Sequence, residues 1–569
     1  MPELIAKPEA ADRRLGAALR AAAALILLSA GVMFVLFRHG GFTVDLFRQD
    51  DLPALIPAGA LLLALAVRPL ALPGLRLGRP AMLLLALALA VLALAFAGTW
   101  LIFGDFAVTR DEILADFDAA FISRGMLIAP VPPEWQAFAG ALMPDFMLPI
   151  PSQAGWLSAY LPGNAALRAL ASLTVGEEWT NPILAAVSVL AVYRIGRRLW
   201  PETPGPALVA ALLMASSAQF LTMAMTPYAM SAHLAFNLLW LWSFLREDWK
   251  GDVGALAAGF VATGLHQLLF HPLFVLPFVA RMWWTGQRRR CAVYLLAYAM
   301  IGLFWACYWQ LLLAGSTAMG GQAGASGLPY LLARLADLLG SIQPSAIALT
   351  GFNLLRALSW QNVVLLPFLI LAWRAVRRGE GIARPLAAGL LLTIAAMMLL
   401  LPWQGLGWGY RYVHGLIGSL VLLAGYGWNT LVAEGRRREF VLAAGSAMSL
   451  LLILPMHLQH AAEYVAPMRR AYAMIARSPA DVVLVDWPWG MANDLVRNAP
   501  DLSNRPKILA GNRLNAAQVR DLCRRYRVEI FDVRHGQRAG LPPALPEGAQ
   551  APPSAVQAAR CGTPLPLGD

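Results

Sequence analysis

The chain has 569 residues, of which 59% are hydrophobic and only 14% are charged. So few charged residues cannot cover a soluble protein of this size, and the composition therefore indicates a polytopic membrane protein. The formal net charge is +12, but the Arg residues gather in short loops between apolar segments. That is the positive-inside pattern, so we expect no nucleic-acid partner.

Apolar segments recur along most of the chain. Residues 1–17 are polar, lack a small-residue cleavage pattern and lead into a full-length apolar segment, so we expect a cytoplasmic N-terminal tail. Residues 18–456 form the predicted transmembrane domain. Within it, hydropathy predicts about thirteen membrane spans, near residues 18–37, 53–70, 81–103, 179–194, 205–224, 227–245, 253–270, 272–285, 291–314, 361–376, 385–402, 412–431 and 440–456.

The loops between these spans alternate in charge. Because every second loop is rich in Arg, the N-terminus is expected to be cytoplasmic and the C-terminus extracytoplasmic. The predicted external segments are 104–178, 315–359, 403–411 and everything after 457. Abundant Arg, Ala, Gly and Leu with only three Lys residues are typical of a GC-rich bacterial genome. We therefore expect a multi-pass protein of the bacterial inner (plasma) membrane.

The last hundred residues change character. Three short strand-like runs, DVVLVDWPWG, RPKILAG and VEIFDV, alternate with helix-like segments, which predicts a small external α/β domain over 457–535. Residues 536–569 are rich in Pro and Gly and are expected to be loosely ordered. The predicted fold class is thus an all-α polytopic membrane protein with a small C-terminal extracytoplasmic α/β domain.

Two of the four cysteines are predicted to form a disulfide. Cys291 and Cys307 share one predicted helix, about 24 Å apart at 1.5 Å per residue, so they cannot bond to each other. Cys523 and Cys561 both follow the last span, in a compartment expected to be oxidising. We therefore predict a bond between Cys523 and Cys561.

Adjacent carboxylates, Asp111 and Glu112, follow the apolar run 81–103 and open the first long external segment. If this segment is helical, Glu112 shares a face with Asp116, and Asp111 lies two turns from Asp118. A partly desolvated carboxylate at a membrane surface can act as a general base, or hold a divalent cation. The alternative is an acidic first turn that is favoured by the helix dipole.

A single cation stands out on the external side. Arg411 is the only Lys or Arg between Arg384 and Arg436, and Tyr410, Tyr412 and His414 flank it. A guanidinium binds phosphate in bidentate fashion, so we expect this segment to contact a phosphate group. The alternative is an aromatic anchor with a snorkelling Arg. His266 and His271 are predicted near the same surface and could hydrogen-bond the phosphate or assist a metal.

The external segment contains further motifs: the DE pair opening a helix, W-x-x-x-Y-x-P-G with Trp156 and Tyr160, W-x-N-P, and Y-x-x-G-R-R-L. Together with MTPYAMSAH and GWGYRYVHG, these resemble the bacterial GT-C integral-membrane glycosyltransferases, relatives of protein O-mannosyltransferases and of the lipid A aminoarabinose transferase (glycosyltransferase family 39-like). The resemblance implies a polyprenyl-phosphate-linked sugar donor, a lipid, glycan or protein acceptor at the outer face, and Asp111 as the base. The chain departs from the family pattern at Ala115 and Asp118, where an aromatic residue and Gln are usual.

Two other classes of protein remain as alternatives. A multi-span transporter would carry charged residues inside its spans, and the predicted span interiors contain essentially none. A catalytically inactive GT-C-like scaffold is consistent with the altered residues after Glu112. A divalent cation, held by Asp111 and Glu112, is the one cofactor that these carboxylates suggest.

Overall fold

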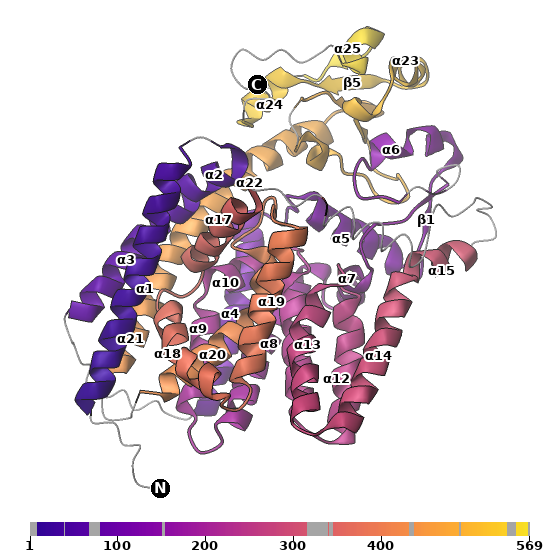
Figure 1. Ribbon diagram of the computed structural model, residues 1–569. Helices are drawn as coiled ribbons and strands as arrows, with labels where there is room; N and C mark the ends of the chain where they lie inside the picture. Colours follow the sequence, from indigo (N-terminus) through magenta and orange to yellow (C-terminus); the bar gives the residue numbers. More distant parts are fainter. Residues whose placement is uncertain are drawn as a thin grey trace.

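The computed structural model describes residues 8–38, 40–67, 80–148, 150, 154–315, 340, 345–431, 437–488, 491–542 and 554–566. Long helices form a bundle, and a small α/β domain lies beyond one end of it (Figure 1). Helix α5 (Arg110–Ile122) lies at this same end, between the bundle and the domain (Figure 1).

Each predicted span overlaps a helix of the bundle, and residues 41–51 and 345–360 add helices that lie outside the predicted spans. These helices are α1 (Pro8–Leu36), α2 (Gly41–Leu46), η1 (Phe47–Asp51), α3 (Leu52–Val67), α4 (Pro80–Gly98), η2 (Thr99–Phe103), α8 (Thr180–Leu199), α9 (Gly205–Ala215), α10 (Ala218–Ala224), α11 (Met230–Phe244), α12 (Trp249–Thr263), α13 (Phe270–Trp284), α14 (Arg288–Ala306), α15 (Tyr308–Gly315), α17 (Ser345–Trp360), α18 (Leu365–Arg378), α19 (Ala383–Leu400), α20 (Ile417–Asn429), α21 (Arg437–Met448), η7 (Ser449–Ile453) and α22 (Leu454–Ala476).

Fewer of these helices are long and apolar enough to cross a membrane by themselves. Six described stretches qualify, namely Ala11–Leu36, Gly41–Val67, Pro80–Phe103, Arg288–Ala306, Ala383–Leu400 and Arg437–Ala476. Two bent pairs raise the number to eight if each is one span: α9 with α10, at 60°, and α17 with α18, at 108°. The predicted number of thirteen spans therefore stays a prediction, whereas the polytopic helical architecture is confirmed.

The part of the chain between α4 and α8 forms a smaller layer, which covers one end of the bundle. It contains α5, β1 (Ala129–Pro130), η3 (Pro133–Phe138), α6 (Ala139–Leu142), β2 (Gly155–Trp156), α7 (Gly163–Ser172) and η5 (Glu177–Trp179). Strands β1 and β2 pair in antiparallel fashion, with Ala129 opposite Trp156. The predicted external segment 104–178 is thus a folded layer. Most of the predicted external segment 315–359 lies outside the described residues.

The C-terminal domain contains a four-stranded parallel sheet, and three of its strands lie in the predicted segments. Strands β3 (Val482–Val485), β4 (Lys507–Ala510), β5 (Val528–Phe531) and β6 (Thr563–Pro564) are ordered β4-β3-β5-β6. The short helical elements of the domain are η8 (Ala492–Leu495), η9 (Gly511–Arg513), α23 (Ala516–Arg525), α24 (Val533–Ala539) and α25 (Ala555–Ala559). Helix α22 runs without interruption from the bundle to Ala476 and leads into this domain.

Both faces of this sheet are buried, as is usual for parallel strands. Because side chains alternate along a strand, Val482 and Leu484 face one side and pack with Phe117 and Trp156 of the external layer. Val483 and Val485 belong to a second cluster, which includes residues of α22. The sheet is therefore wedged between the external layer and the end of α22.

The segment 536–569, which is predicted to be loosely ordered, contains regular elements in its described part. Helix α25 and strand β6 lie within it, and β6 extends the sheet beside β5. The disulfide explains part of this order, because Cys523 and Cys561 are bonded as predicted, with their Cα atoms 6.3 Å apart. The bond attaches the terminal segment to α23.

Removing this disulfide should destabilise the α/β domain. The bond closes a loop with a sequence separation of 38 residues, so replacing Cys523 and Cys561 together by Ser should cost roughly 3–4 kcal/mol on the loop-entropy model. Urea-dependent proteolysis of the domain in purified protein would measure the shift. In intact cells, an impermeant thiol reagent should label Cys523 only after reduction. Labelling without reduction would contradict the bond in the cell, and a lack of labelling even after reduction would contradict the external location.

Candidate functional site

The candidate site is built on the first turn of α5. Thr109 caps this helix, and Glu112 reaches back to it: Oε2 of Glu112 accepts hydrogen bonds from the backbone N–H groups of Val108 and Thr109, both at 2.9 Å. This reciprocal arrangement is a capping box, which satisfies N–H groups that a helix start leaves without partners. The side chain of Glu112 is wholly buried and points at its own helix end.

Asp111 points in another direction and meets three segments that are distant in sequence. The hydroxyl group of Tyr160 donates a hydrogen bond to Oδ1 of Asp111, and Nη1 of Arg411 donates to Oδ2. The side chains of Asp111 and Arg411 are each 14% exposed. The ring of His266 stacks on Tyr160, with 4.2 Å between ring centroids. Asp111, Tyr160, His266 and Arg411, all predicted site residues, therefore form one cluster, called here the Asp111 cluster.

The loop 401–410 places Arg411 by several backbone contacts. Arg356 of α17 donates hydrogen bonds from Nη2 and Nε to the carbonyl oxygen of Gly407, at 2.8 and 3.2 Å. Gln219 of α10 donates to the carbonyl oxygen of Tyr410 at 2.8 Å. Gly409 has a positive φ of 80°, and a Cβ atom there would lie 2.6 Å from the Gln219 side chain. Glycine is therefore required where the loop approaches α10.

Tyr228 connects this loop to α5. Its hydroxyl group accepts a hydrogen bond from Oγ1 of Thr109 at 2.9 Å and donates one to the carbonyl oxygen of Leu406 at 3.2 Å. The guanidinium group of Arg411 lies over the rings of Tyr228 and Tyr412, at 5.8 and 5.3 Å from the centroids. Tyr228 was not among the predicted site residues, although it lies in the MTPYAMSAH segment that carried part of the resemblance.

The electrostatics keep Asp111 charged. Burial acts to raise its pKa, but Arg411, His266 and the hydrogen bond from Tyr160 outweigh burial and lower the pKa below its usual value. Burial and the neighbouring carboxylate raise the pKa of Tyr160, so the phenol stays a donor. Burial lowers the pKa of His266 to about 4, against the attraction of Asp111. At neutral pH the cluster therefore contains a carboxylate, a guanidinium, a phenol and a neutral imidazole.

Glu112 differs from Asp111 in chemistry as well as in position. Burial raises the pKa of Glu112 to about 7, although the hydrogen bonds from Thr109 and Val108 oppose the shift. The structure therefore separates the predicted catalytic pair, because Glu112 caps the helix and Asp111 meets Arg411. Of the two, Asp111 alone has the geometry expected of a base.

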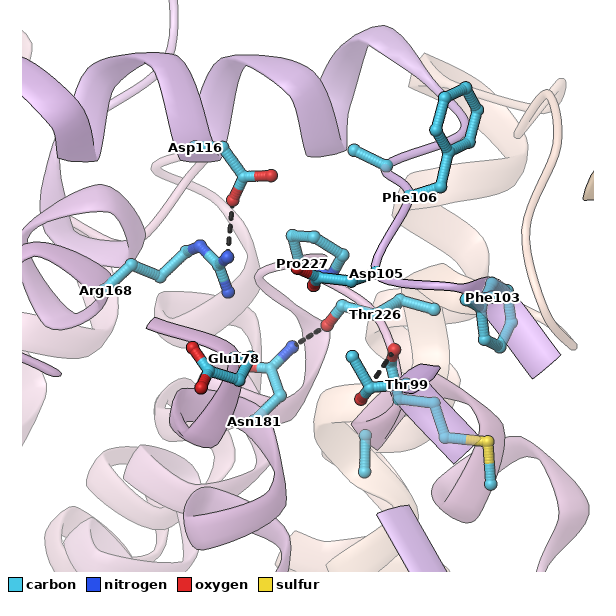
Figure 2. A pocket seen from close by; sticks show the side chains of 13 residues that line it. Thr99, Phe103, Asp105, Phe106, Asp116, Arg168, Glu178, Asn181, Thr226 and Pro227 are labelled. Carbon is cyan, nitrogen blue, oxygen red and sulfur yellow. Dashed lines mark hydrogen bonds and ion pairs between the residues drawn. The ribbon is translucent and has the colours of Figure 1, made fainter. Parts of the chain in front are cut away.

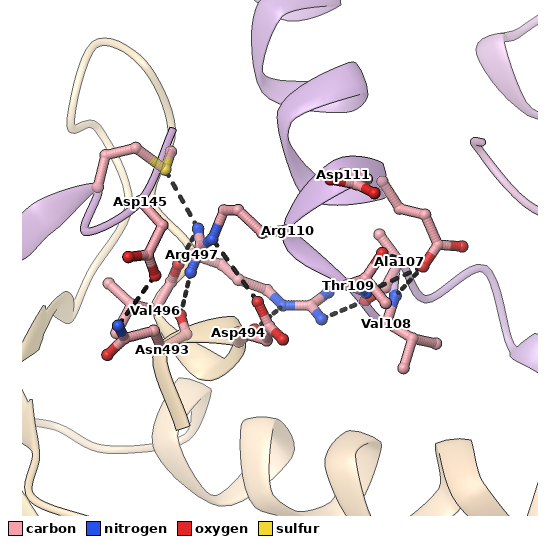
Figure 3. Close-up of polar contacts among 12 residues, drawn as sticks. Ala107, Val108, Thr109, Arg110, Asp111, Asp145, Asn493, Asp494, Val496 and Arg497 are labelled. Atoms are coloured by element: carbon pink, nitrogen blue, oxygen red, sulfur yellow. Dashed lines mark hydrogen bonds and ion pairs between the residues drawn. The ribbon is translucent and has the colours of Figure 1, made fainter. Parts of the chain in front are cut away.

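The C-terminal domain holds the residues that precede Asp111 (Figure 3). Arg110 donates hydrogen bonds to the carbonyl oxygens of Val496, at 3.2 Å, and of Asn493. Arg497 donates to the carbonyl oxygen of Ala107, and its guanidinium group lies 3.6 Å from the ring centroid of Phe106. Residues 106–110 are thus clamped by the segment 493–497.

A small polar cavity lies beside Asp116 of α5 (Figure 2). Asp116 forms an ion pair with Arg168 of α7 at 2.5 Å, and Asp105, Glu178 and Asn181 complete the polar lining. The cavity volume of about 20 Å³ suits a single water molecule. We therefore read the Asp116–Arg168 pair as a contact that fixes α5 on α7, and sequence spacing gave no signal for it.

Four other residues that are predicted to bind substrate are packed inside the protein. Trp156 is buried against Phe117 and donates a hydrogen bond to the carbonyl oxygen of Pro500 at 2.9 Å. His271 uses both ring nitrogens, toward Asn237 and Tyr298, each at 2.7 Å. Tyr410 packs in an apolar cluster, and His414 is fully buried. Segments that are distant in the sequence cover these four side chains. The spacing of residues along the sequence does not reveal such contacts.

The metal hypothesis finds no support in the donor groups. Within the described ranges, no group of three or more His, Cys, Asp or Glu side chains could hold a metal ion. Both carboxylate oxygens of Asp111 are engaged by Arg411 and Tyr160. In the Asp111 cluster the carboxylate is thus paired with a guanidinium group and a phenol.

A cluster of buried charged residues lies just outside the predicted spans. The stretch Gly41–Val67 contains the buried pair Asp50 and Asp51. Arg356 contacts both of them, with Nη2 3.2 Å from Asp50 and Nη1 3.1 Å from Asp51. His457 of α22 also contacts Asp50, at 2.7 Å. Hydropathy missed this cluster because the charged residues lie at the ends of the predicted spans.

Comparisons with known proteins give likenesses of structure only. No family model matches the chain, and no curated protein matches it. The chain is similar to the structure of ArnT from Cupriavidus metallidurans bound to undecaprenyl phosphate, with 14% identity, 74% of this chain and 85% of that chain covered, and a TM-score of 0.46. It is also similar to the arabinofuranosyltransferase AftD from Mycobacteria, with 16% identity, 74% and 30% covered, and a TM-score of 0.37.

Asp118 on α5 offers a test of these electrostatics. Burial raises its pKa to about 7, and only a hydrogen bond with Ser158 opposes the shift. Above pH 7 the buried carboxyl group of Asp118 is ionised, and its burial lowers the free energy of unfolding. This penalty decreases as the pH falls from 7 toward 3.8, the pKa of the group in the unfolded chain. Asp118→Asn should raise the unfolding free energy at pH 8 by about 1–3 kcal/mol, with a smaller gain at pH 5. Thermal unfolding at the two pH values would measure this, and an equal or reversed gain would contradict the buried-carboxyl assignment.

Proposed function

We propose that the chain is a membrane glycosyltransferase of the bacterial inner membrane. It transfers a sugar from a polyprenyl-phosphate donor to a hydroxyl group at the outer face, with the N-terminus in the cytoplasm. One observation carries the proposal: Asp111 and Arg411, which are 300 residues apart, form a largely buried ion pair where α5 meets loop 401–410. The donor class comes from the sequence resemblance.

The proposed reaction needs a base and a cation, and the cluster supplies both. Asp111 takes the proton of the acceptor hydroxyl group, whose oxygen attacks the anomeric carbon of the donor. The bond between that carbon and the phosphate oxygen breaks, and its electron pair leaves with the polyprenyl phosphate. Arg411 stabilises the charge that collects on this phosphate. Tyr160 orients the carboxylate, and the neutral His266 stacks on Tyr160.

Transport is the alternative that one observation favours. Asp50, Asp51 and Arg356 are buried within candidate spans, where ionisable groups commonly mark a transport pathway. These groups are engaged with one another and with the carbonyl oxygen of Gly407. Because these charged groups already satisfy one another, we interpret them as a structural contact between η1, α17 and loop 401–410. A transport pathway would need groups that are free to bind and release an ion.

Asp111→Asn should abolish sugar transfer. The amide has the shape of the carboxylate but cannot accept the hydroxyl proton, so we expect at least a hundred-fold loss, within the usual range for a general base. Transfer of labelled sugar from a polyprenyl-phosphate donor by purified protein would measure it. Asp521→Asn, which changes a carboxylate of α23 that pairs with Arg525, is the matched control. Unchanged turnover in the folded Asp111→Asn protein would refute the assignment of the base.

Arg411→Ala should weaken donor binding. Loss of a charge-assisted contact with phosphate costs about 1.5–3 kcal/mol, which is roughly a ten- to 150-fold higher Kd. Arg411→Lys should be intermediate, because lysine keeps the charge but lacks the planar fork. Equilibrium binding of undecaprenyl phosphate to the protein in nanodiscs would give the Kd. Equal affinities of the wild type and Arg411→Ala would show that Arg411 serves only to hold Asp111.

A further inference from the structure

A cleft separate from the Asp111 cluster lies beside Trp408. It has a volume of about 290 Å³ and is lined by η1, α17, loop 401–410 and α22, through Gln49, Asp50, Arg356, Trp408, Glu463 and Tyr464, among others. This volume is at the lower end of the range for small-ligand sites, roughly 300–1,000 Å³. The elements α2, α17 and α22 meet at the end of the bundle where α5 lies (Figure 1).

The floor of this cleft is rigid. Asp50 contacts Arg356 at 3.2 Å and His457 at 2.7 Å, and Asp51 accepts a hydrogen bond from Ser359 at 2.7 Å. These side chains are buried and hold one another. The floor therefore presents fixed groups and has little freedom to collapse into the empty volume.

The walls offer hydrogen-bonding groups together with aromatic surface. Trp408 is 4% exposed, and its Nε1 has no hydrogen-bond partner among the described residues. Such a buried donor is costly unless a ligand or water accepts from it. The rings of Trp408 and Tyr464 lie 6.3 Å apart at 83°. Gln49 and Glu463 lie at the exposed rim and add oxygen atoms that can accept from hydroxyl groups.

The charge of the cleft argues against an anionic occupant. Glu463 lies at the rim, while Arg356 and His460, the basic groups of the lining, are already engaged by Asp50 at 3.2 Å each. A phosphate group would meet these carboxylates at close range. A neutral ring with several hydroxyl groups instead matches the acceptor oxygens, the indole N–H and the aromatic faces.

The cleft is also connected to the Asp111 cluster through loop 401–410. Leu406 and Trp408 line the cleft, while the carbonyl oxygen of Leu406 accepts from Tyr228, over which Arg411 lies. The same loop ends at Arg411. The cleft and the Asp111 cluster are therefore built on the same loop.

We propose that this cleft binds one sugar residue of a glycan, and that the acceptor of the reaction is accordingly a neutral, polyhydroxylated glycan chain. The assignment of the acceptor rests on the proposed transferase function, whereas glycan binding itself does not. Glu463 and Gln49 accept hydrogen bonds from sugar hydroxyl groups, Trp408 donates one from its indole N–H, and the aromatic rings contact the apolar face of the sugar.

Binding of neutral trisaccharides to the full chain in nanodiscs tests this proposal. Calorimetric titration would use mannotriose, cellotriose and chitotriose as probes, with phosphoethanolamine as the lipid-headgroup comparison. We expect at least one trisaccharide to bind, with a Kd at least ten-fold higher in Glu463→Ala and in Trp408→Phe. The exposed Glu202→Ala, in the loop between α8 and α9, is the matched control. It should bind like the wild type.

The outcomes separate glycan binding from catalysis. Failure of all three trisaccharides to bind, equal affinity in Glu463→Ala, or binding of phosphoethanolamine instead would overturn the glycan site. Glu463→Ala is on the exposed rim and keeps the test valid if Trp408→Phe does not fold. If a trisaccharide binds in a Glu463-dependent manner but the wild type transfers no sugar to it from a polyprenyl-phosphate donor, the glycan site stands and the proposed function fails.

Discussion

The Asp111–Arg411 ion pair is the constraint on which this end of the helical bundle depends. Two charged side chains that are only 14% exposed cannot remain there singly, because an unpaired buried charge costs several kcal/mol. The pair therefore requires that α5 and loop 401–410 keep a fixed relative position. Three sets of contacts stabilise that position: the capping box of Glu112, the hydrogen bonds of Arg110 to residues 493–496 and those of Arg356 to Gly407.

The same pair has a chemical consequence if the proposed function holds. In the unliganded protein, Arg411 lowers the pKa of Asp111 and so makes it a weaker base. A donor phosphate competes with the carboxylate of Asp111 for the guanidinium group of Arg411, because each anion can accept two parallel hydrogen bonds from that group. When Arg411 turns to the phosphate, Asp111 loses its cation and becomes more basic. Donor binding would thus prepare the base that the acceptor needs.

Much of this arrangement could be predicted from sequence, for identifiable reasons. Hydropathy located the helices, and the scarcity of cations on the external side singled out Arg411. Tyr160 and His266 were found by residue chemistry and motif. The role of Glu112 was missed although its signal was present, because Thr109-x-x-Glu112 is the capping-box pattern. The partners of Trp156 and His271 come from distant segments, and one sequence gives no measure of that proximity.

The C-terminal domain is part of the site's support and not a separate appendage. Its sheet packs against the external layer on one face and against α22 on the other. Helix α22 also carries His457, which contacts Asp50 in the bundle, while Arg497 of the domain holds Ala107 just before α5. A displacement of the domain would therefore act on α5 directly and on the Trp408 cleft through α22. The bundle, the layer 104–178 and the C-terminal domain follow one another in the sequence. In the fold they pack together around Asp111, where charged and apolar side chains from all three are buried.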